Sequence, residues 1–534
     1  MRINFGISWD YQTHYNSVHI YFPLTTPTIV AHPYNYLLFK ALGRIIMSDS
    51  EARTAREEWG SRFGFLMAML GAMVGAGNIW RMPFTTGENG GGAFLVAYIL
   101  LLYLIAVPGL MAETMIGRYT NNGVIGAFKQ VLGSKRAQGL GLVVLIVNVA
   151  LMSYYAPIIG WALYYAGHSV LMTFTQPGFQ PQAFWDGFIN NPALVVGMHT
   201  VTMAGLAGVL VFGIRRGIER VVKWMIPLLV VALVAVSIRG ITLPGGMEGV
   251  AFVFTPDWGY LTRGSTWVAA LSQALFSTGL GWGIALTYGS YLSRYDDVPL
   301  GGGLFTAIGN TSIGLLAVFA TFPVVFAFGL EPSAGSNLLF ISMAQVFPEL
   351  PGGSLWAIVF FVSFFFATFT SGLGITEVAV TTVSEETRLS RTGAVLASCG
   401  AIWLFGLPSA YSSAFLGRMD FMFGSFGLPL ATLSIIALVA WKFGPERARV
   451  LDLNRNAGIY VGPWWNPVVK YVIPVVMVFI LGYGVYSSIG TSNQRLMLLG
   501  VAFMAALVVV STVVMSVVGD EPPSGSAAVP GGDD

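Results

Sequence analysis

The sequence has little charge. Only 10% of its 534 residues are Asp, Glu, Lys or Arg, while 55% are hydrophobic, and the formal net charge is +2. Soluble globular domains carry about 25% charged residues, so this composition excludes an ordinary soluble domain and predicts a polytopic membrane protein. Nucleic acid is not an expected partner, because no basic cluster accompanies a stacking surface.

Cysteine and histidine are also scarce. The single cysteine, Cys399, lies in an apolar segment, so the sequence predicts neither a disulfide framework nor a thiolate metal site. The five histidines are scattered along the chain, and the sequence contains no HExxH or GxSxG motif. We therefore expect that the protein is not an enzyme.

The two ends of the sequence differ from what lies between them. Residues 1–46 have no helical period and lack the basic start and compact apolar core of a signal peptide. We expect Met47 to be the true initiator, and residues 1–46 to be a gene-start error or at most a disordered tail. Residues 519–534 are rich in Pro, Gly and acidic residues and are expected to be disordered. Residues 47–518 form the expected transmembrane domain.

Long apolar runs dominate residues 47–518. A bilayer crossing needs about 20 apolar residues in a helix, and the runs predict an all-α protein with about twelve transmembrane helices. Their expected extents are 61–86, 91–118, 138–171, 193–213, 217–238, 264–292, 302–329, 353–384, 391–408, 415–442, 464–489 and 495–518.

Lys and Arg are unevenly distributed between the loops. With the N-terminus inside, most of them fall on the cytoplasmic side, whereas the outer side holds only Arg81, Arg239, Arg263, Arg418 and Arg495. Because cytoplasmic loops are enriched in basic residues, we expect a multi-pass protein of the cell membrane with both termini cytoplasmic.

Two expected spans contain glycine clusters. Gly71, Gly75 and Gly77 lie within the first span, and the sixth contains the run 276–283, FSTGLGWG. Each Gly costs about 1 kcal/mol relative to Ala in a helix. One such cluster is compatible with a glycine-rich packing face, but two, five spans apart, indicate broken helices. Paired broken helices in corresponding places point to a transporter site between inverted repeats.

The order of the motifs is similar to that of a known family. GAMVGAGNIWRMPF (71–84), ENGGGAFLVAYI (88–99), GRY (117–119), SYY (153–155), QALFSTGLGWG (273–283), ATFTSG (367–372) and RMDF (418–421) resemble the neurotransmitter:sodium symporter family. Its prokaryotic amino-acid transporters, such as the bacterial leucine transporter, are the most similar branch. The resemblance implies a 5+5 inverted repeat with broken helices 1 and 6, plus two C-terminal helices.

The resemblance implies two sodium sites built from neutral oxygen atoms, which suit a hard cation. The first site would use Met73, Asn78, Ser277 and Asn310, together with the carboxylate of the substrate. The second would use Gly71, Val74, Ala367, Thr370 and Ser371. For Thr370 and Ser371 taken alone, hydrogen bonds back to their own helix carbonyls are the more ordinary expectation.

The resemblance also implies a substrate site. Its residues would be Met73, Ala76, Gly77, Leu151, Tyr155, Phe276, Ser277, Trp282 and Ile375. The carboxylate would meet the amides of Ala76 and Gly77, and Tyr155 and Phe276 would close over the ligand. Monoamine transporters of the family carry an aspartate where this chain has Gly75, so we favour an α-amino acid.

Charged residues match the gates of the family. Arg81 and Asp420 correspond to its outer gate pair, and Arg56 and Glu385 to its inner pair, with Trp59 beside them. A hydrated ion pair contributes only about 0–1 kcal/mol and is easily broken. Glu113 and Glu377 are intramembrane acids and hence functional candidates, but the sequence assigns them only to a buried polar network.

Some positions depart from the leucine transporter. Gly279 replaces a serine that contacts the amine there, while Trp282 and Leu151 are larger than the matching pocket residues. A reshaped pocket is compatible with small aliphatic or aromatic side chains. Near Gly314 the chain has neither the serine of chloride-dependent members nor the acid of many chloride-independent ones, so chloride use stays open.

We therefore expect a secondary active symporter that couples inward sodium flow to uptake of an α-amino acid by alternating access. The alternatives are a proton-coupled amino-acid or polyamine-type transporter of the same fold, and a transport-inactive amino-acid sensor. A homodimer is one option for its assembly.

Overall fold

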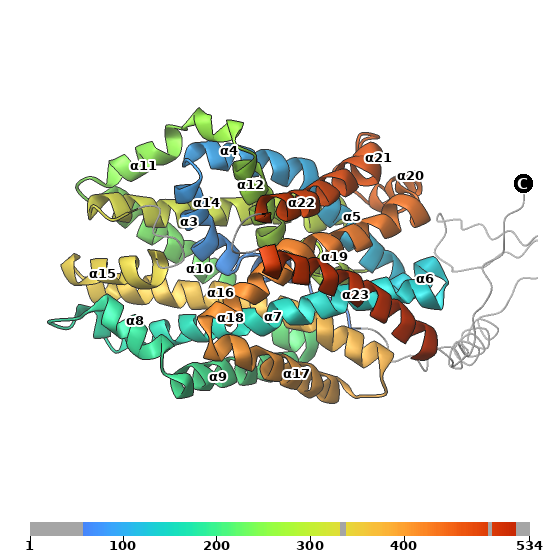
Figure 1. The fold of residues 1–534 in the computed structure, drawn as a ribbon, viewed down its shortest axis with the longest axis horizontal. Coiled ribbons are helices and arrows are strands. Elements are labelled where there is room, and N and C mark those ends of the chain that lie inside the picture. The colour runs from blue at the N-terminus through green and yellow to red at the C-terminus, as the bar shows by residue number, and fades with distance from the viewer. Residues whose placement is uncertain (1–56, 332–337, 490–493, 519–534) are drawn as a thin grey trace, which may run out of the picture. The chain divides into compact units, whose positions relative to one another are not determined.

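Helices make up the regular structure of the protein. The computed structural model describes residues 57–331, 338–489 and 494–518, and in these ranges every regular element is helical (Figure 1). All of them belong to the compact unit that begins at Glu57. The predicted N-terminal extension and the acidic tail lie outside the described residues, as does Arg56.

The first five spans contain the following elements. Span one is α2 (Arg62–Met73), the π-helical turn η1 (Gly77–Arg81) and α3 (Met82–Glu88). Span two is α4 (Gly92–Leu101), η2 (Leu102–Ala106) and α5 (Val107–Thr120). After α6 (Val124–Leu132), α7 (Lys135–Val170) is span three. After η3 (Thr173–Thr175) and α8 (Pro181–Ile189), α9 (Pro192–Leu210) is span four. Span five is η4 (Ile214–Ile218) and α10 (Glu219–Ile241).

The next five spans follow two short helices, α11 (Gly246–Phe254) and η5 (Trp258–Thr262). Span six is α12 (Gly264–Thr278) and α13 (Ile284–Gly289), and span seven is η6 (Pro299–Phe305) and α14 (Thr306–Ala327). After η7 (Leu338–Ser342), α15 (Met343–Val346) and η8 (Phe347–Glu349), span eight is α16 (Gly353–Glu386). Span nine is α17 (Arg391–Tyr411). Span ten is α18 (Ser413–Met419), η9 (Asp420–Gly427), α19 (Leu428–Ala437) and η10 (Leu438–Phe443).

Two more spans end the described chain. They follow α20 (Pro445–Arg447) and η11 (Ala448–Leu453). Span eleven is α21 (Trp465–Pro467), η12 (Val468–Val472) and α22 (Ile473–Ser488), and span twelve is α23 (Gln494–Val518).

The predicted fold class is confirmed. Within the described ranges, ten helices are long and apolar enough to cross a membrane, and the bent first span makes eleven. The interrupted pair α12 and α13 occupies the sixth predicted span. Helices are expected here because hydrocarbon offers no partner for a free backbone group, so each segment must satisfy its own.

The two longest helices hold the centre of the fold. α7 and α16, with 36 and 34 residues, lie side by side (Figure 1). α16 also packs against α2 and α13, which flank the two predicted breaks, and α5 packs against α13. The interruptions in spans one and six are therefore held between continuous helices.

Candidate substrate and ion site

The first span is broken at its middle. α2 ends at Met73, Val74 adopts an extended conformation (φ −81°, ψ 96°), and the two halves differ in direction by 53°. Gly75 lies in the break, where a Cβ atom would come within 2.4 Å of the Tyr155 hydroxyl. The close contact with Tyr155 leaves room only for glycine at residue 75. The break also turns the backbone amide of Ala76 toward Tyr155, and the Tyr155 hydroxyl oxygen accepts a hydrogen bond from this amide over 2.9 Å.

The sixth span is broken at the second glycine cluster. Gly279, Gly281 and Gly283 have φ angles of +66°, +85° and +78°, a region that other residues adopt at a cost. The helix therefore stops at Thr278 and resumes at Ile284. Both breaks predicted from the glycine clusters are present.

Three helices supply partners for the backbone groups freed in the sixth span. Glu113 on α5 accepts from the Gly281 amide (3.0 Å), Asn148 on α7 donates to the Trp282 carbonyl (2.8 Å), and Thr432 on α19 donates to the Leu280 carbonyl (3.2 Å). A free backbone group in hydrocarbon costs several kcal/mol. These side chains allow the break to persist in the membrane, and they give Glu113 a role.

The two breaks face each other. A Cβ atom on Gly77 would lie 2.8 Å from the Phe276 ring, and Gln273 donates to the Gly77 carbonyl over 2.6 Å. Between the breaks is a cavity of about 10 Å³. Of the predicted substrate residues, Met73, Gly77, Tyr155, Phe276, Trp282 and Ile375 line it. The other three, Ala76, Leu151 and Ser277, are buried and are not among the lining residues.

A network of amides and hydroxyls lies beside the cavity. Asn78 donates to the backbone and side-chain oxygens of Asn310, each over 2.9 Å. The Asn310 amide in turn donates to Ser277 (3.1 Å) and Tyr98 (3.3 Å), whose hydroxyls lie 3.1 Å apart. The side-chain oxygen of Asn78 is buried and has no hydrogen-bond partner among the residues that the structure describes. The structure thus brings together the three side chains expected at the first sodium site, with an oxygen atom still able to bind a cation.

A second group of oxygen atoms lies where α2 packs against α16. Ser371 donates to the Ala72 carbonyl over 2.8 Å, next to the end of α2, and a Cβ atom on Gly71 would lie 3.3 Å from Thr370. The Thr370 hydroxyl donates back to its own helix, to the carbonyls of Phe366 (2.9 Å) and Ala367 (3.2 Å). The residues expected at the second sodium site are neighbours, although both hydroxyls bind carbonyls here.

The residues expected at the outer gate have separate partners. Arg81 donates to Ser272 over 3.0 Å, and its guanidinium group lies 4.9 Å from the centre of the Phe276 ring. Asp420 accepts from the Tyr154 hydroxyl over 3.0 Å. Among the described residues, Arg81 and Asp420 form no direct ion pair. Each charged group instead contacts an aromatic side chain near the cavity, Arg81 the Phe276 ring and Asp420 the Tyr154 hydroxyl.

The segment that precedes α2 is bound to the end of α13 and the start of α10. Trp59 donates to the Tyr288 carbonyl over 3.1 Å and packs edge-on against its ring. The Gly60 amide and the Ser61 hydroxyl donate to Glu219 over 2.7 and 2.9 Å. Glu385 accepts from the Gly123 amide over 2.7 Å. These contacts join the segment before α2 to α13 and α10, and α16 to the start of α6.

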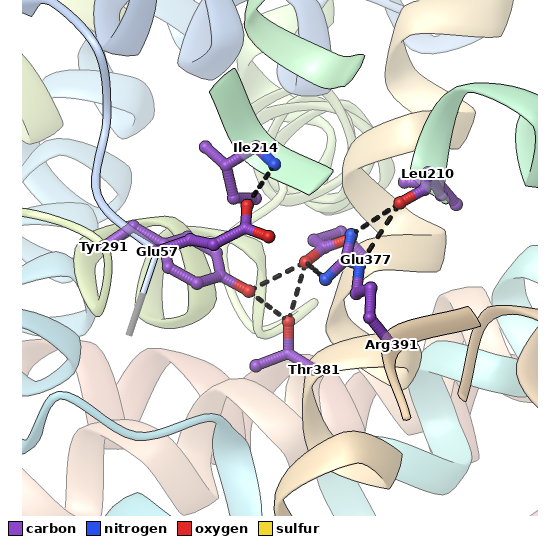
Figure 2. Close-up of polar contacts among 7 residues, drawn as sticks. All are labelled: Glu57, Leu210, Ile214, Tyr291, Glu377, Thr381 and Arg391. Atoms are coloured by element: carbon purple, nitrogen blue, oxygen red, sulfur yellow. Dashed lines mark hydrogen bonds and ion pairs between the residues drawn. The ribbon is translucent and has the colours of Figure 1, made fainter. Parts of the chain in front are cut away.

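Glu377 is the centre of a polar cluster at the same end of the molecule (Figure 2). Arg391 binds both of its carboxylate oxygens, over 2.6 and 2.7 Å, and Tyr291 and Thr381 donate to one of them over 2.7 and 2.9 Å. Arg391 also donates to the Leu210 carbonyl, at the end of α9. The cluster therefore joins α9, α16, α17 and the segment after α13.

Gly314 is closely covered. A Cβ atom there would lie 2.5 Å from the Met82 sulfur atom and 3.4 Å from the Asn78 amide nitrogen. Met82 therefore fills the space that a serine or an acid at residue 314 would need.

These observations define the class of protein: a polytopic helical membrane transporter with two broken spans around a central site. A model of the sodium:neurotransmitter symporter family matches residues 56–180 and 189–519. The chain therefore belongs to this family, and its family and fold are those of transporters, not of enzymes.

Individual relatives agree with this assignment. An uncharacterised sodium-dependent transporter of Bacillus subtilis, YhdH, is 32% identical over 447 residues, which cover 80% of this chain and 98% of that protein. The sodium-dependent serotonin transporter of Drosophila melanogaster is 28% identical over 521 residues, which cover 87% of this chain and 81% of that protein. The crystal structure of MhsT in complex with L-phenylalanine is similar with a TM-score of 0.74 and 32% identity, covering 80% of this chain and 100% of that one.

Proposed function

We propose that the protein is a sodium-coupled symporter that takes up an α-amino acid by alternating access. The observation that carries the proposal is the arrangement of the two breaks, which enclose a cavity lined by Tyr155 and Phe276, with a network of amides and hydroxyls beside it. Membership of a sodium symporter family and the sodium-dependent relatives support the use of Na⁺.

The substrate binds through its carboxylate and its amine. Its carboxylate meets the amides of Ala76 and Gly77 at the start of a half-helix, where the helix dipole favours an anion, and the hydroxyl of Tyr155. The carbonyls of Met73, Phe276 and Ser277 receive its amine. Gly75 carries no acid that would neutralise the amine of a ligand without a carboxylate. MhsT, whose structure holds phenylalanine, supports the amino-acid class.

Two sodium ions accompany the substrate. The first binds Met73, Asn78, Ser277 and Asn310 and is completed by the substrate carboxylate. The unpartnered oxygen atom of Asn78 fits this role. The second binds Gly71, Val74, Ala367, Thr370 and Ser371. The two hydroxyls donate their hydrogen atoms to helix carbonyls, which leaves the lone pairs of their oxygen atoms for the cation.

Opening and closing would involve both gates. On the outer side, Arg81 and Asp420 move toward each other when the cavity closes, together with the side chains that they contact, Phe276 and Tyr154. On the inner side, Arg56 and Glu385 join the contacts that residues 59–61 already make. The proposed location is the cell membrane, with both termini cytoplasmic, and a homodimer is a compatible assembly.

Uptake into proteoliposomes tests the proposal. The purified protein is reconstituted, and the uptake of labelled amino acids is compared under inward gradients of sodium, potassium and choline. We expect accumulation only with sodium. Equal uptake with all three cations contradicts sodium coupling, and uptake driven by a proton gradient alone favours the proton-coupled alternative. Binding without accumulation under any gradient identifies a sensor.

A further inference from the structure

The fifth span carries an exposed apolar stripe along α10. Trp224, Leu228, Val231 and Ile238 are between 53% and 73% exposed, and their spacing of four, three and seven residues places them on one face of the helix. In a membrane protein such a face contacts the acyl chains of lipids, which are as apolar as Leu. From Trp224 to Ile238 the stripe is about 21 Å long at 1.5 Å per residue, which is most of the thickness of the hydrocarbon.

Two arginines continue this stripe beyond its tryptophan. Arg220 lies one turn before Trp224 on the same face, and Arg216, in η4, lies one turn before Arg220. Both arginines are exposed, and this end of the span is expected to be cytoplasmic. Trp side chains favour the boundary between hydrocarbon and water. The two guanidinium groups therefore lie at the level of the lipid headgroups.

Two acids near the start of α10 are engaged elsewhere. Glu219 binds Lys223 over 2.5 Å, and Glu57 accepts a hydrogen bond from a backbone amide at the start of η4. Within the described ranges, the side chains of Arg216 and Arg220 form neither an ion pair nor a hydrogen bond with the protein. The end of the stripe thus carries uncompensated positive charge, together with guanidinium N–H groups that are free to donate.

Phosphate is the anion that such a pair of arginines suits. Guanidinium groups bind phosphate oxygens through paired N–H donors, and basic side chains next to a span attract anionic lipids. A soluble phosphate would gain only the exposed arginines, whereas a phospholipid would also lay its acyl chains on the apolar stripe. We propose that Arg216, Arg220 and Trp224 form a binding site for an anionic phospholipid, whose phosphate meets the arginines and whose chains follow the stripe toward Ile238. The site is separate from the central cavity and holds whatever the transported substrate is.

Another exposed pair of arginines supplies a matched control. Arg294 and Arg455 belong to two turns on the same expected side of the membrane, and the Asn456 side chain joins these turns by donating to the Arg294 carbonyl over 3.0 Å. Neither arginine lies on a helix with an exposed apolar stripe, and aspartates are close to both in the sequence. Removing this pair takes the same charge from the protein without touching the proposed site.

Native mass spectrometry of the purified full-length protein tests the proposal. Phosphatidylglycerol and phosphatidylcholine with the same acyl chains are titrated onto the protein in detergent. We expect the first phosphatidylglycerol to bind at least about 10-fold more tightly than phosphatidylcholine, because only its headgroup is anionic. Equal affinities overturn the proposal. Excess glycerol 3-phosphate should not displace the lipid, and its displacement would identify a soluble phosphate as the ligand instead.

Two double variants assign the preference to this patch. Arg216→Gln/Arg220→Gln is expected to weaken the binding of phosphatidylglycerol about 10-fold or more and to leave that of phosphatidylcholine as it is. Arg294→Gln/Arg455→Gln should retain the preference for phosphatidylglycerol. An equal loss in both double variants would mean that the lipid responds only to the overall charge of the protein, which contradicts a site.

Fluorescence quenching in phosphatidylcholine vesicles locates the lipid. Phosphatidylglycerol with acyl chains brominated near the headgroup is expected to quench tryptophan emission more than the same amount of brominated phosphatidylcholine, because it stays beside Trp224. Most of this difference should disappear in Trp224→Phe, which keeps an aromatic ring at the boundary. A difference that persists unchanged in Trp224→Phe places the bound lipid elsewhere on the protein and overturns the proposal.

Discussion

The carboxylate of Glu113 accepts the hydrogen bond of the Gly281 amide over 3.0 Å, although the two residues belong to spans two and six. This contact explains why an acid is present within an apolar helix. The break in span six frees backbone groups in a setting without water, and Glu113, Asn148 and Thr432 bind them. Two of the three helices that bind them, α5 and α19, contribute no residue to the wall of the cavity.

Removal of the acceptor at Glu113 should destabilise the protein. Glu113→Gln keeps an oxygen atom for the Gly281 amide, whereas Glu113→Leu leaves this amide without a partner, at a cost of about 1–3 kcal/mol. We expect a lower melting temperature in detergent for Glu113→Leu than for Glu113→Gln, measured by thermal unfolding. Equal melting temperatures would show that the amide does not need Glu113.

The break in span one should not tolerate a methyl group. In Gly75→Ala the new Cβ atom would lie 2.4 Å from the Tyr155 hydroxyl, so we expect sodium-driven uptake to fall at least about 10-fold, in line with an overpacking cost of 1–3 kcal/mol. Gly197→Ala is the control, because no atom lies within 4 Å of a Cβ atom there. Normal uptake by Gly75→Ala would mean that the close contact with Tyr155 is not required.

Asn78 should contribute to the binding of both sodium and substrate. Asn78→Ala removes an oxygen atom from the proposed first sodium site, and losing a buried polar partner of a charged group costs about 1.5–3 kcal/mol. We expect both affinities to fall by about 10-fold or more in equilibrium binding. Asn456→Ala, which alters an exposed residue bound to the Arg294 carbonyl, should leave both affinities as they are. Loss of only one of the two affinities in Asn78→Ala would argue against a shared site.

The Glu377–Arg391 pair should be sensitive to the loss of one partner and tolerant of the loss of both. Arg391→Met leaves a fully buried carboxylate unpaired, which costs about 3–5 kcal/mol. The double variant Glu377→Leu/Arg391→Met replaces both charges with apolar groups and should recover most of the lost thermal stability. A double variant less stable than Arg391→Met would show that the pair contributes more than charge compensation.

The sequence predicts the spans and the breaks well because both follow from local physics. Apolar runs of bilayer length specify the helices, and glycine clusters disfavour a continuous helix, because each Gly costs about 1 kcal/mol relative to Ala. The family resemblance implied that Asn78, Ser277 and Asn310 bind a sodium ion; the structure joins their side chains by hydrogen bonds, and their binding of sodium stays a prediction.

Long-range partners were not predictable in the same way. Asn148 and Thr432 were missed, because a polar residue in a span reveals nothing of which distant carbonyl it meets. The only signal was that an amide within hydrocarbon needs a partner. Likewise, Glu377 was recognised as an intramembrane acid, but its pairing with Arg391 depends on how α16 packs against α17.

The most direct test of a joint sodium and substrate site is reciprocal binding. The affinity of the purified protein for the labelled amino acid that it takes up in proteoliposomes is measured at increasing sodium concentrations, and its affinity for sodium at increasing concentrations of that amino acid. If the two ligands share the cavity between the breaks, each raises the affinity for the other by the same factor. Amino-acid binding that is independent of sodium would contradict the account.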